Sequence, residues 1–273
     1  MKFKNAAALA LAALAISSGV ARAELTPLVQ SFATPVPGPG GGQFFEFYLP
    51  AMNSAGVASF KGDVNVTTSN TGIFRTDGAN IVSIARAGQT APGAGLGTFS
   101  AVNSFTAMNA AGQVAMLGTL SGTNDGSTTG LFRGDGTILT RLARDKEFAP
   151  AGGNYAVGFG IPYLNSIGQA AFIANVTGTA DGSTVGIYRT NGVSSGVMAR
   201  DKQGAPGAGG GFYTTNFTLG TLLDSGHAIF QAALSGTNDT SNIGIFSNNG
   251  TGATAIVRNR WAAPGGGVYS SIT

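Results

Sequence analysis

Four stretches of the chain share one pattern and decide the fold: NSAGVASF at residues 53–60, NAAGQVAM at 109–116, NSIGQAAF at 165–172 and LDSGHAIF at 223–230. They align without gaps, and successive glycines of the pattern lie 56, 56 and 58 residues apart. Self-similarity at a long fixed period is typical of repeat architectures. The chain is therefore expected to contain about four copies of one structural unit.

Two further blocks follow each copy in constant order. The first is GIFRTDG from residue 72, GLFRGDG from 130, GIYRTNG from 186 and GIFSNNG from 244. The second ends in Arg86, Arg144, Arg200 or Arg258, each six residues before a proline in a glycine-rich loop. Three spaced blocks in one order favour a true repeat over a single recurring motif.

Each copy has the pattern of four antiparallel strands. In the third copy the strands are expected at residues 155–164, at 170–176, from 187 onwards and at 197–200. The turn at 165–168 contains Asn and Gly, which favour the positive φ of a tight reversal. The Asn191-Gly192 pair predicts a hairpin. No stretch combines helical spacing with helix caps.

Four antiparallel strands repeated at this period predict an all-β fold, a β-propeller of about four four-stranded antiparallel blades. The expected blades span approximately residues 43–91, 97–149, 153–205 and 210–263, and residues 264–273 start a further repeat. A stacked β-solenoid, whose rungs are usually shorter, and a plain sandwich, which would not repeat, are the alternatives.

The two ends predict that the ring is incomplete. Residues 28–33 look like a fourth strand without its first three, and residues 268–273 begin another first strand. We therefore expect either a truncated copy of a longer protein or an open ring with two unpaired edges, which are prone to aggregation.

The first 23 residues have the order of a secretory signal peptide. Two lysines precede an apolar run at residues 6–16, and the small residues Ala21 and Ala23 end the segment. The run is too short to anchor the chain across a bilayer. We expect cleavage before Glu24 and export to the extracellular space, the cell surface or the periplasm. The alternative is a buried N-terminal helix.

Composition excludes several classes of protein. Only 10% of the 273 residues are charged, 43% are hydrophobic and none is Cys, which permits a buried core and excludes disulfide scaffolds and cysteine metal cages. Three of the 15 basic residues lie in the expected signal peptide, so residues 24–273 carry 12 basic and 12 acidic residues. A neutral chain gives no support to nucleic-acid binding. A second long apolar stretch is not found, so no transmembrane anchor is predicted.

The NSIGQAAF-type blocks, the GIFRTDG-type blocks and the PGxGG loops together resemble exported bacterial choice-of-anchor proteins with tandem NxxGxxAF repeats. Some members of that family end in a PEP-CTERM sorting signal. The resemblance covers roughly the whole mature chain and implies a β-propeller-like exported protein of unassigned activity, not catalysis. Leu223 replaces the Asn of the fourth motif, Met116 replaces the Phe of the second, and no anchor segment is present.

The repeated arginines are candidate ligand-binding residues: Arg86, Arg144, Arg200 and Arg258. By strand alternation each shares a face with Ile84, Leu142, Met198 or Ile256, so its stem packs on apolar neighbours and its guanidinium reaches the strand end. A ring of such cations around a channel would bind an anionic sugar or phosphate. The alternative, favoured because the position is filled in every copy, is a structural pair with Asp77, Asp135 or a loop carbonyl.

The loops at residues 122–130, 178–186 and 236–244 look like Ca²⁺ loops or the Asp-boxes of sialidase-type propellers. Each holds a single carboxylate, Asp125, Asp181 or Asp239, whereas Ca²⁺ takes six to eight oxygen ligands. Turn chemistry explains them better. No metal and no cofactor are predicted.

The remaining candidates are isolated residues. Trp261 lies between two arginines and could stack on a sugar, so it joins the candidate ligand-binding residues. His227 is the only His, which formally permits one Ser-His-Asp triad. Asp63, Asp135 and Glu147 could converge from distant blades as a glycosidase pair, but nothing in the sequence singles them out. No catalytic residue is assigned.

The sequence as a whole predicts an exported noncatalytic repeat protein that acts as a surface or extracellular scaffold or interaction module. Its partners would be cell-envelope or extracellular polysaccharide or protein, and not nucleic acid. The alternative is a carbohydrate-binding or glycan-hydrolysing propeller with a site on one rim.

Overall fold

The computed structural model describes residues 8–9, 28–38, 41–65, 70–207 and 209–272. All the regular secondary structure of these residues is β-strand. The expected signal peptide lies outside the described residues apart from β1 (Ala8–Leu9), which pairs with β2 (Val29–Gln30). A search of the described part of the chain finds no helix with the length and apolarity needed to cross a membrane.

Four antiparallel sheets follow one another along the chain, and each is called a blade below. Blade 1 consists of β3 (Phe44–Met52), β4 (Ala58–Val64), β5 (Thr71–Thr76) and β6 (Ile81–Arg86). Blade 2 consists of β7 (Thr98–Met108), β8 (Val114–Ser121), β9 (Thr129–Gly134) and β10 (Leu139–Arg144). Blade 3 consists of a divided first strand, β11 (Asn154–Phe159) and β12 (Tyr163–Leu164), then β13 (Ala170–Thr177), β14 (Val185–Thr190) and β15 (Ser195–Arg200). Blade 4 consists of β16 (Phe212–Leu222), β17 (Ala228–Ser235), β18 (Ile243–Asn248) and β19 (Ala253–Arg258).

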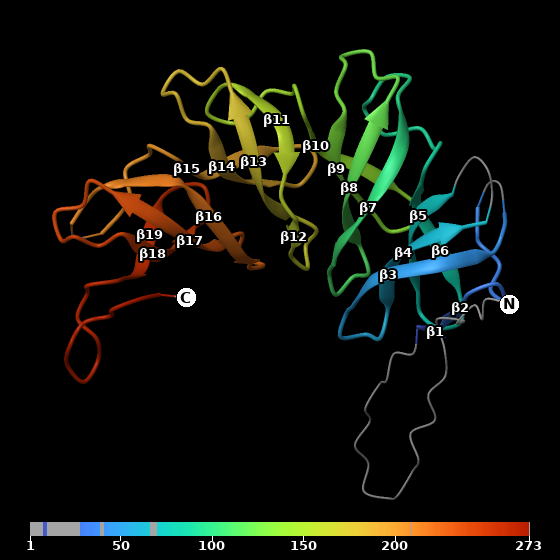
Figure 1. Ribbon diagram of the computed structural model, residues 1–273, viewed down its shortest axis with the longest axis horizontal. Helices are drawn as coiled ribbons and strands as arrows, with labels where there is room; N and C mark the ends of the chain where they lie inside the picture. The colour runs from blue at the N-terminus through green and yellow to red at the C-terminus, as the bar shows by residue number, and fades with distance from the viewer. Residues whose placement is uncertain (1–7, 10–27, 39–40, 66–69, 208, 273) are drawn as a thin grey trace, which may run out of the picture.

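The blades are arranged along an open arc (Figure 1). The first strands β3, β7, β12 and β16 lie on the inside of the arc, and the fourth strands β6, β10, β15 and β19 lie on the outside (Figure 1). β7 packs against β3, β4 and β5 of the preceding blade, and β16 packs against β13, β14 and β15. Radial packing of four-stranded meanders is the propeller architecture. The predicted all-β propeller is confirmed.

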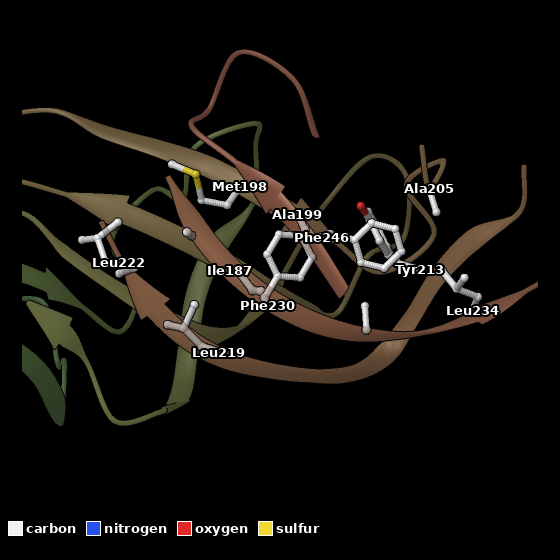
Figure 2. Packing of buried hydrophobic residues seen from close by; sticks show 13 residues of the cluster. Ile187, Met198, Ala199, Ala205, Tyr213, Leu219, Leu222, Phe230, Leu234 and Phe246 are labelled. Atoms are coloured by element: carbon white, nitrogen blue, oxygen red, sulfur yellow. The ribbon is translucent and has the colours of Figure 1, made fainter. Parts of the chain in front are cut away.

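The hydrophobic core lies in the seams between blades. Figure 2 shows the seam of blades 3 and 4, where Ile187, Met198 and Ala199 of blade 3 meet Phe230 and Phe246 of blade 4. All five side chains are buried. Burying one large apolar side chain contributes about 1.5–3 kcal/mol. The blades therefore stabilise one another and cannot separate without exposing this surface.

Each blade also stacks aromatic rings within itself, and glycines make room for them. In blade 2 the rings of Phe99 and Phe132 meet edge to face at 4.8 Å. A Cβ added to Gly118 would lie 2.6 Å from Phe99 Cε1, and one added to Gly130 would lie 2.9 Å from Phe132 Cε2. The first glycine of each GIFR-type block is thus required by packing and not by a turn.

The strand alternation expected around the arginines is wrong, because each fourth strand contains a β-bulge. In blade 3, Ala199 pairs with Ile187 and Val197 pairs with Tyr188, which leaves Met198 as the extra residue. The same register shift occurs at Ile84, Leu142 and Ile256. Met198 and Ala199 consequently face the seam with blade 4, whereas Arg200 contacts Tyr188 in the core shared with blade 2.

Segments at both ends repeat the contacts that link successive blades. The amide of Lys202 donates to the carbonyl of Tyr213 at 2.8 Å where blade 3 passes into blade 4. Phe32 and Phe44 make the same bond at 2.8 Å before blade 1, and Arg260 and Tyr269 make it at 2.8 Å after blade 4. The incomplete or truncated ring expected from the sequence stays a prediction.

Candidate functional site

The repeated arginines end the outermost strand of each blade and are buried, with side chains at most 5% exposed. Arg200 donates to the carbonyls of Pro150 and Gly152, each at 2.6 Å, and to the Tyr188 hydroxyl at 2.9 Å. Arg258 donates to the carbonyls of Pro206 at 2.6 Å and Gly210 at 2.8 Å. These carbonyls belong to the loop that enters the same blade. The guanidinium therefore ties the fourth strand of a blade to the loop before its first strand, a contact called the arginine clamp below.

In blade 2 the clamp uses carboxylates. Arg144 bonds Asp125 at 2.8 Å and Glu147 at 3.0 Å, and it donates to the Ser127 hydroxyl at 2.9 Å. Hydrogen bonds from Ser127, together with the charge of Arg144, lower the pKa of Asp125 to about 2. The partner of Arg144 is thus not Asp135, which instead accepts bonds from Thr137 and Ile138 within its own hairpin turn.

The positions of the four repeated arginines can be compared with the ring of cations that the sequence suggests. The arginines stand on the outer strands β6, β10, β15 and β19, while the first strands lie on the inside of the arc (Figure 1). An anion reaching Arg200 would have to displace loop carbonyls that already bond it. Ligand binding by Arg86, Arg144, Arg200 and Arg258 stays a prediction.

Trp261 is half-buried beside the clamp of blade 4. Its indole nitrogen donates to Asp239 at 3.3 Å. A Cβ added to Gly207 would lie 3.0 Å from the indole ring, so the loop before blade 4 covers part of the ring. Sugar stacking by Trp261 stays a prediction.

The loops compared with Ca²⁺ sites form local turns. Asp125, Asp181 and Asp239 each accept a bond from the amide of the serine two residues later, at 3.0–3.1 Å. Among the described residues, no group of three or more His, Cys, Asp or Glu comes together that could hold a metal ion. Asp63, Asp135 and Glu147 therefore do not form a group of three. The ring of His227 lies 3.0 Å from the Ser225 hydroxyl in an exposed turn.

The repeated asparagine of the NxxGxxAF turn bridges neighbouring blades. Its side-chain amide donates to the carbonyl of the corresponding residue in the next blade: Asn53 to Asn109 at 3.1 Å, Asn109 to Asn165 at 2.9 Å, and Asn165 to Leu223 at 3.1 Å. Asn109 and Asn165 are buried. The sequence pattern indicated the turn, but it did not indicate this bond across the seam.

A second repeated donor runs beside the asparagine. Three arginines of the GIFR-type blocks donate to the turn glycine of the next blade: Arg75 to Gly112 at 2.9 Å, Arg133 to Gly168, and Arg189 to Gly226 at 2.6 Å. Together with the asparagines they form what we call the seam ladder. In blade 4 the two donors are replaced by Leu223 and Ser247.

One polar cluster departs from the repeat, and it lies in blade 1. The Tyr48 hydroxyl is 2.8 Å from a carboxylate oxygen of Glu46 and 3.0 Å from one of Asp63. The ammonium of Lys61 lies 3.8 Å from Asp63 and 4.4 Å from the centre of the Tyr48 ring. Hydrogen bonding to Glu46 raises the pKa of Tyr48 well above its usual value, and burial and Asp63 raise it further. We call these four residues the blade 1 cluster.

A protein-family model, DUF7453, described as a family of unknown function, matches residues 20–273. The chain belongs to the DUF7453 family. A search of curated proteins finds no match to this DUF7453 protein. Among solved structures it is similar to the GH93 α-L-arabinofuranosidase of Fusarium graminearum with arabinobiose, at 12% identity, and to an α-L-arabinofuranosidase from Fusarium graminearum with an iminosugar inhibitor, at 11%. Both alignments cover 80% of this chain and 67% of the other at a TM-score of 0.32, a likeness too low to bear on function.

The blade 1 cluster of this DUF7453 protein was missed by sequence reasoning, although a signal was present. Glu46 pairs with Asp63 across β3 and β4, and the corresponding pair in blade 2 is Ala101 and Thr119. Comparing the copies position by position, and asking where one copy alone is charged, would have singled out Glu46 and Asp63. The repeated residues drew attention instead.

Proposed function

We propose that this DUF7453 protein is an exported, noncatalytic propeller that serves as a scaffold or interaction module outside the cytoplasm. The proposal rests on the contacts that the recurring polar side chains of the protein make. The asparagines of the seam ladder and the arginines of the clamps bond backbone carbonyls or neighbouring side chains. These recurring groups thus take part in contacts that hold the blades together.

The proposed location outside the cytoplasm is supported by the N-terminal sequence. The order of two lysines, an apolar run and the small residues Ala21 and Ala23 is that of a signal peptide. The resemblance to choice-of-anchor NxxGxxAF proteins points the same way. Cell-envelope or extracellular polysaccharide or protein is the partner class that we propose.

Export is tested by producing the chain from Met1 in a bacterial host beside a matched variant, Ala23→Asp, which removes the small residue at the expected cleavage site. We expect wild type to appear outside the cytoplasm with Glu24 as its first residue by mass spectrometry. The variant should keep residues 1–23. An intact N-terminus on wild-type protein in the cytosol would contradict the proposal.

The absence of catalysis is tested with a panel of chromogenic glycosides, esters and phosphate esters, combined with an array of glycans. We expect wild type to show no more turnover than a variant of the arginine clamp, such as Arg258→Met, that is purified in the same way. Turnover that follows the folded protein through purification would overturn the noncatalytic assignment.

A second candidate function, a carbohydrate-binding or glycan-hydrolysing propeller, is supported by the blade 1 cluster. Two carboxylates, from Glu46 and Asp63, contact a single hydroxyl. Glycosidases use paired carboxylates, one as acid and one as base or nucleophile. If the cluster hydrolyses glycans, Glu46→Gln and Asp63→Asn should each abolish turnover, whereas a binding site should show affinity without turnover.

A further inference from the structure

The face that each blade turns toward the next blade, called its exit face below, has a constant plan. In blade 3 the exit face consists of four residues from β13, β14 and β15: Ala171, Ile187, Met198 and Ala199. Blade 4 covers them, and each is at most 1% exposed. The first and last of these four positions hold small residues in blades 1, 2 and 3: Ser59 and Ala85, Ala115 and Ala143, Ala171 and Ala199. Small side chains at these positions let the next blade approach closely.

Blade 4, at one end of the arc, departs from this plan (Figure 1). Its residues at the same four positions are Ile229, Ile245, Ile256 and Val257. Both small positions therefore hold larger, β-branched residues, and none of the four is charged. Ile256 is 52% exposed, and the other three are partly exposed. Terminal units of repeat proteins need a polar outer face for solubility, and exposed apolar patches mark interaction sites. The exit face of blade 4 thus has the composition of a covered surface.

A blade that follows the repeat does not match this exit face. The two donors of the seam ladder are missing, because Leu223 and Ser247 replace the asparagine and the arginine. The turn carbonyls of a following blade would lack the bonds that blades 1 to 3 supply to their neighbours. The larger side chains of Ile229 and Val257 would also keep such a blade farther away. The partner of this face must therefore differ from the next blade of the repeat.

The segment after blade 4 leaves the face open. The side chain of Gln231, which is in register with Ile245, donates to the carbonyl of Ile272 at 2.9 Å. Tyr269 of this segment is exposed, whereas its counterpart Tyr213 in blade 4 is buried in the seam with blade 3. The segment thus adds apolar surface beside the exit face and does not replace a blade.

Blade 1, at the other end of the arc, offers no matching open face. Residues 28–36 cover its side that points away from blade 2, and its stacked rings are buried: Phe44, Phe60 and Phe74. A Cβ added to Gly78 of blade 1 would lie 3.2 Å from Leu28 of this segment. One added to the corresponding Gly250 of blade 4 would lie 3.4 Å from Met198 of blade 3. Leu28 thus takes the place before blade 1 that a fourth strand takes before the next blade. A head-to-tail contact between two copies would have to displace it.

We infer that the exit face of blade 4 binds the same face of a second copy of this chain around a two-fold axis. In such an isologous contact one surface patch meets itself, so two copies close the assembly and no filament grows. An apolar face without charges is complementary to itself, and the contact needs neither the ladder donors nor the covered side of blade 1. Ile256 is then covered by the second copy, as blade 4 covers Met198 of blade 3. The inference goes beyond the proposed scaffold, because it assigns a partner that does not depend on any ligand.

The test is sedimentation equilibrium of the purified chain from micromolar to millimolar concentration. The variants are Ile256→Lys and, as a matched control, Val193→Lys, which places the same charge at a 96% exposed aliphatic residue of blade 3. We expect wild type and the control to form dimers. Ile256→Lys should raise the dissociation constant about tenfold or more, because the contact would bury an ammonium without a partner. Ile256 is half exposed in the single chain, so the lysine is accommodated there, and thermal melts at low concentration check the fold.

A second measurement distinguishes a two-fold contact from a head-to-tail contact. The sequence contains no Cys, so a single introduced cysteine can react only with the same residue of another copy. The variants are Ile229→Cys, Ile245→Cys, Ile256→Cys and Val257→Cys, with Val193→Cys as the control. A two-fold axis through the face brings at least one of these four positions close to itself. We expect a short bismaleimide to link that variant into dimers and to leave the control unlinked.

Several outcomes would overturn the inference. They are a wild-type chain that stays monomeric, a dimer that Ile256→Lys leaves intact, species that keep growing with concentration, and no cross-link at any of the four positions. None of these outcomes bears on export or on the absence of catalysis, which have their own tests above. Because a dimer stabilises the folded chain by mass action, unfolding free energies of blade 4 variants are compared at concentrations where the chain is monomeric.

Discussion

Blades 3 and 4 form the same turn, but only blade 3 carries the asparagine in it. In blade 3 the turn is closed by bonds between Asn165 and Gln169 at 3.0 Å and between Gly168 and Asn165 at 3.1 Å. In blade 4 the bonds between Leu223 and His227 and between Gly226 and Leu223, both 2.9 Å, close it without an asparagine. The backbone bonds of the turn therefore form without an asparagine. Where the asparagine is present, its side chain accepts a bond from the Gln169 amide of its own turn at 2.8 Å and donates to the Leu223 carbonyl of the next blade at 3.1 Å.

The apolar positions show the same difference. Met198 of blade 3 is 1% exposed because blade 4 covers it, whereas Ile256, its counterpart in blade 4, is 52% exposed. Among the described residues no fifth sheet follows blade 4. The repeat thus contains two kinds of residue. Blade 4 keeps those that close a blade, but at the two donor positions that join a blade to the next one it has Leu223 and Ser247.

The largest effect is expected from the arginine clamps, because they close individual blades. Arg200→Met leaves the carbonyls of Pro150 and Gly152 without their donor, and Arg258→Met does the same to Pro206 and Gly210. We expect each variant to lose about 3 kcal/mol of unfolding free energy, measured by urea denaturation. The two losses should be similar, since the clamp does not depend on a following blade.

The clamp variants also test the predicted anion site. If Arg200→Gln folds as wild type does but no longer binds an anionic sugar or phosphate that wild type binds, the ring of cations is favoured over the clamp. A loss of folding in Arg200→Gln, with no anion bound by wild type, supports the structural reading.

The next largest effect should distinguish the two turns. Asn165→Leu copies the residue of blade 4 into blade 3 and removes both the 3.1 Å bond to the Leu223 carbonyl and the 2.8 Å bond from the Gln169 amide of its own turn. Removing a buried hydrogen bond in this way is expected to cost about 1–3 kcal/mol. The reciprocal variant Leu223→Asn should change stability by less than about 0.5 kcal/mol, because substitutions at the protein surface usually have effects within this range. A gain in stability for Leu223→Asn as large as the loss for Asn165→Leu would show that the asparagine serves mainly its own turn.

A smaller effect is expected at the second donor of the ladder. Arg189→Ala removes the 2.6 Å bond to the Gly226 carbonyl, which lies partly exposed between blades 3 and 4. We expect a loss of about 1 kcal/mol. Ser247→Arg, its counterpart in blade 4, should be neutral in the same denaturation measurement. A gain in stability for Ser247→Arg would mean that blade 4 finds an acceptor for the arginine.

The same contrast explains what could be predicted from the sequence. The strands, turns and propeller class follow from local patterns: Gly168 adopts the positive φ of +82° that the NxxG turn requires. The bond from Asn165 to Leu223 could not be predicted, because it joins residues 58 positions apart whose proximity depends on how two blades pack. The bulge at Met198 was missed because a two-residue period assumes an uninterrupted strand.

The blade 1 cluster was missed for a different reason. Repeats direct attention to what is shared, whereas Glu46 and Asp63 are informative because other copies lack them. Charge alone groups Asp63 with Asp135 and Glu147. Asp135 accepts bonds within its hairpin turn, and Glu147 bonds Arg144 and Arg141 in blade 2. Cross-strand register, which pairs Glu46 with Asp63, was the missing information.

The smallest effect is a pH dependence that separates the clamp of blade 2 from that of blade 3. The pKa of Asp125 falls from 3.8 to about 2 on folding, mainly through hydrogen bonds from Ser127. A group with a depressed folded pKa contributes stability above its unfolded pKa and loses it as pH falls through the folded value. Wild type should therefore lose this contribution between about pH 4 and pH 2, whereas Asp125→Asn should lose less over that range. Arg200 is bonded by backbone carbonyls, and Pro150→Ala keeps the carbonyl. The stability of Pro150→Ala should therefore depend on pH as that of wild type does. If the stability of Asp125→Asn falls as steeply with pH as that of wild type, the carboxylate does not support the blade 2 clamp.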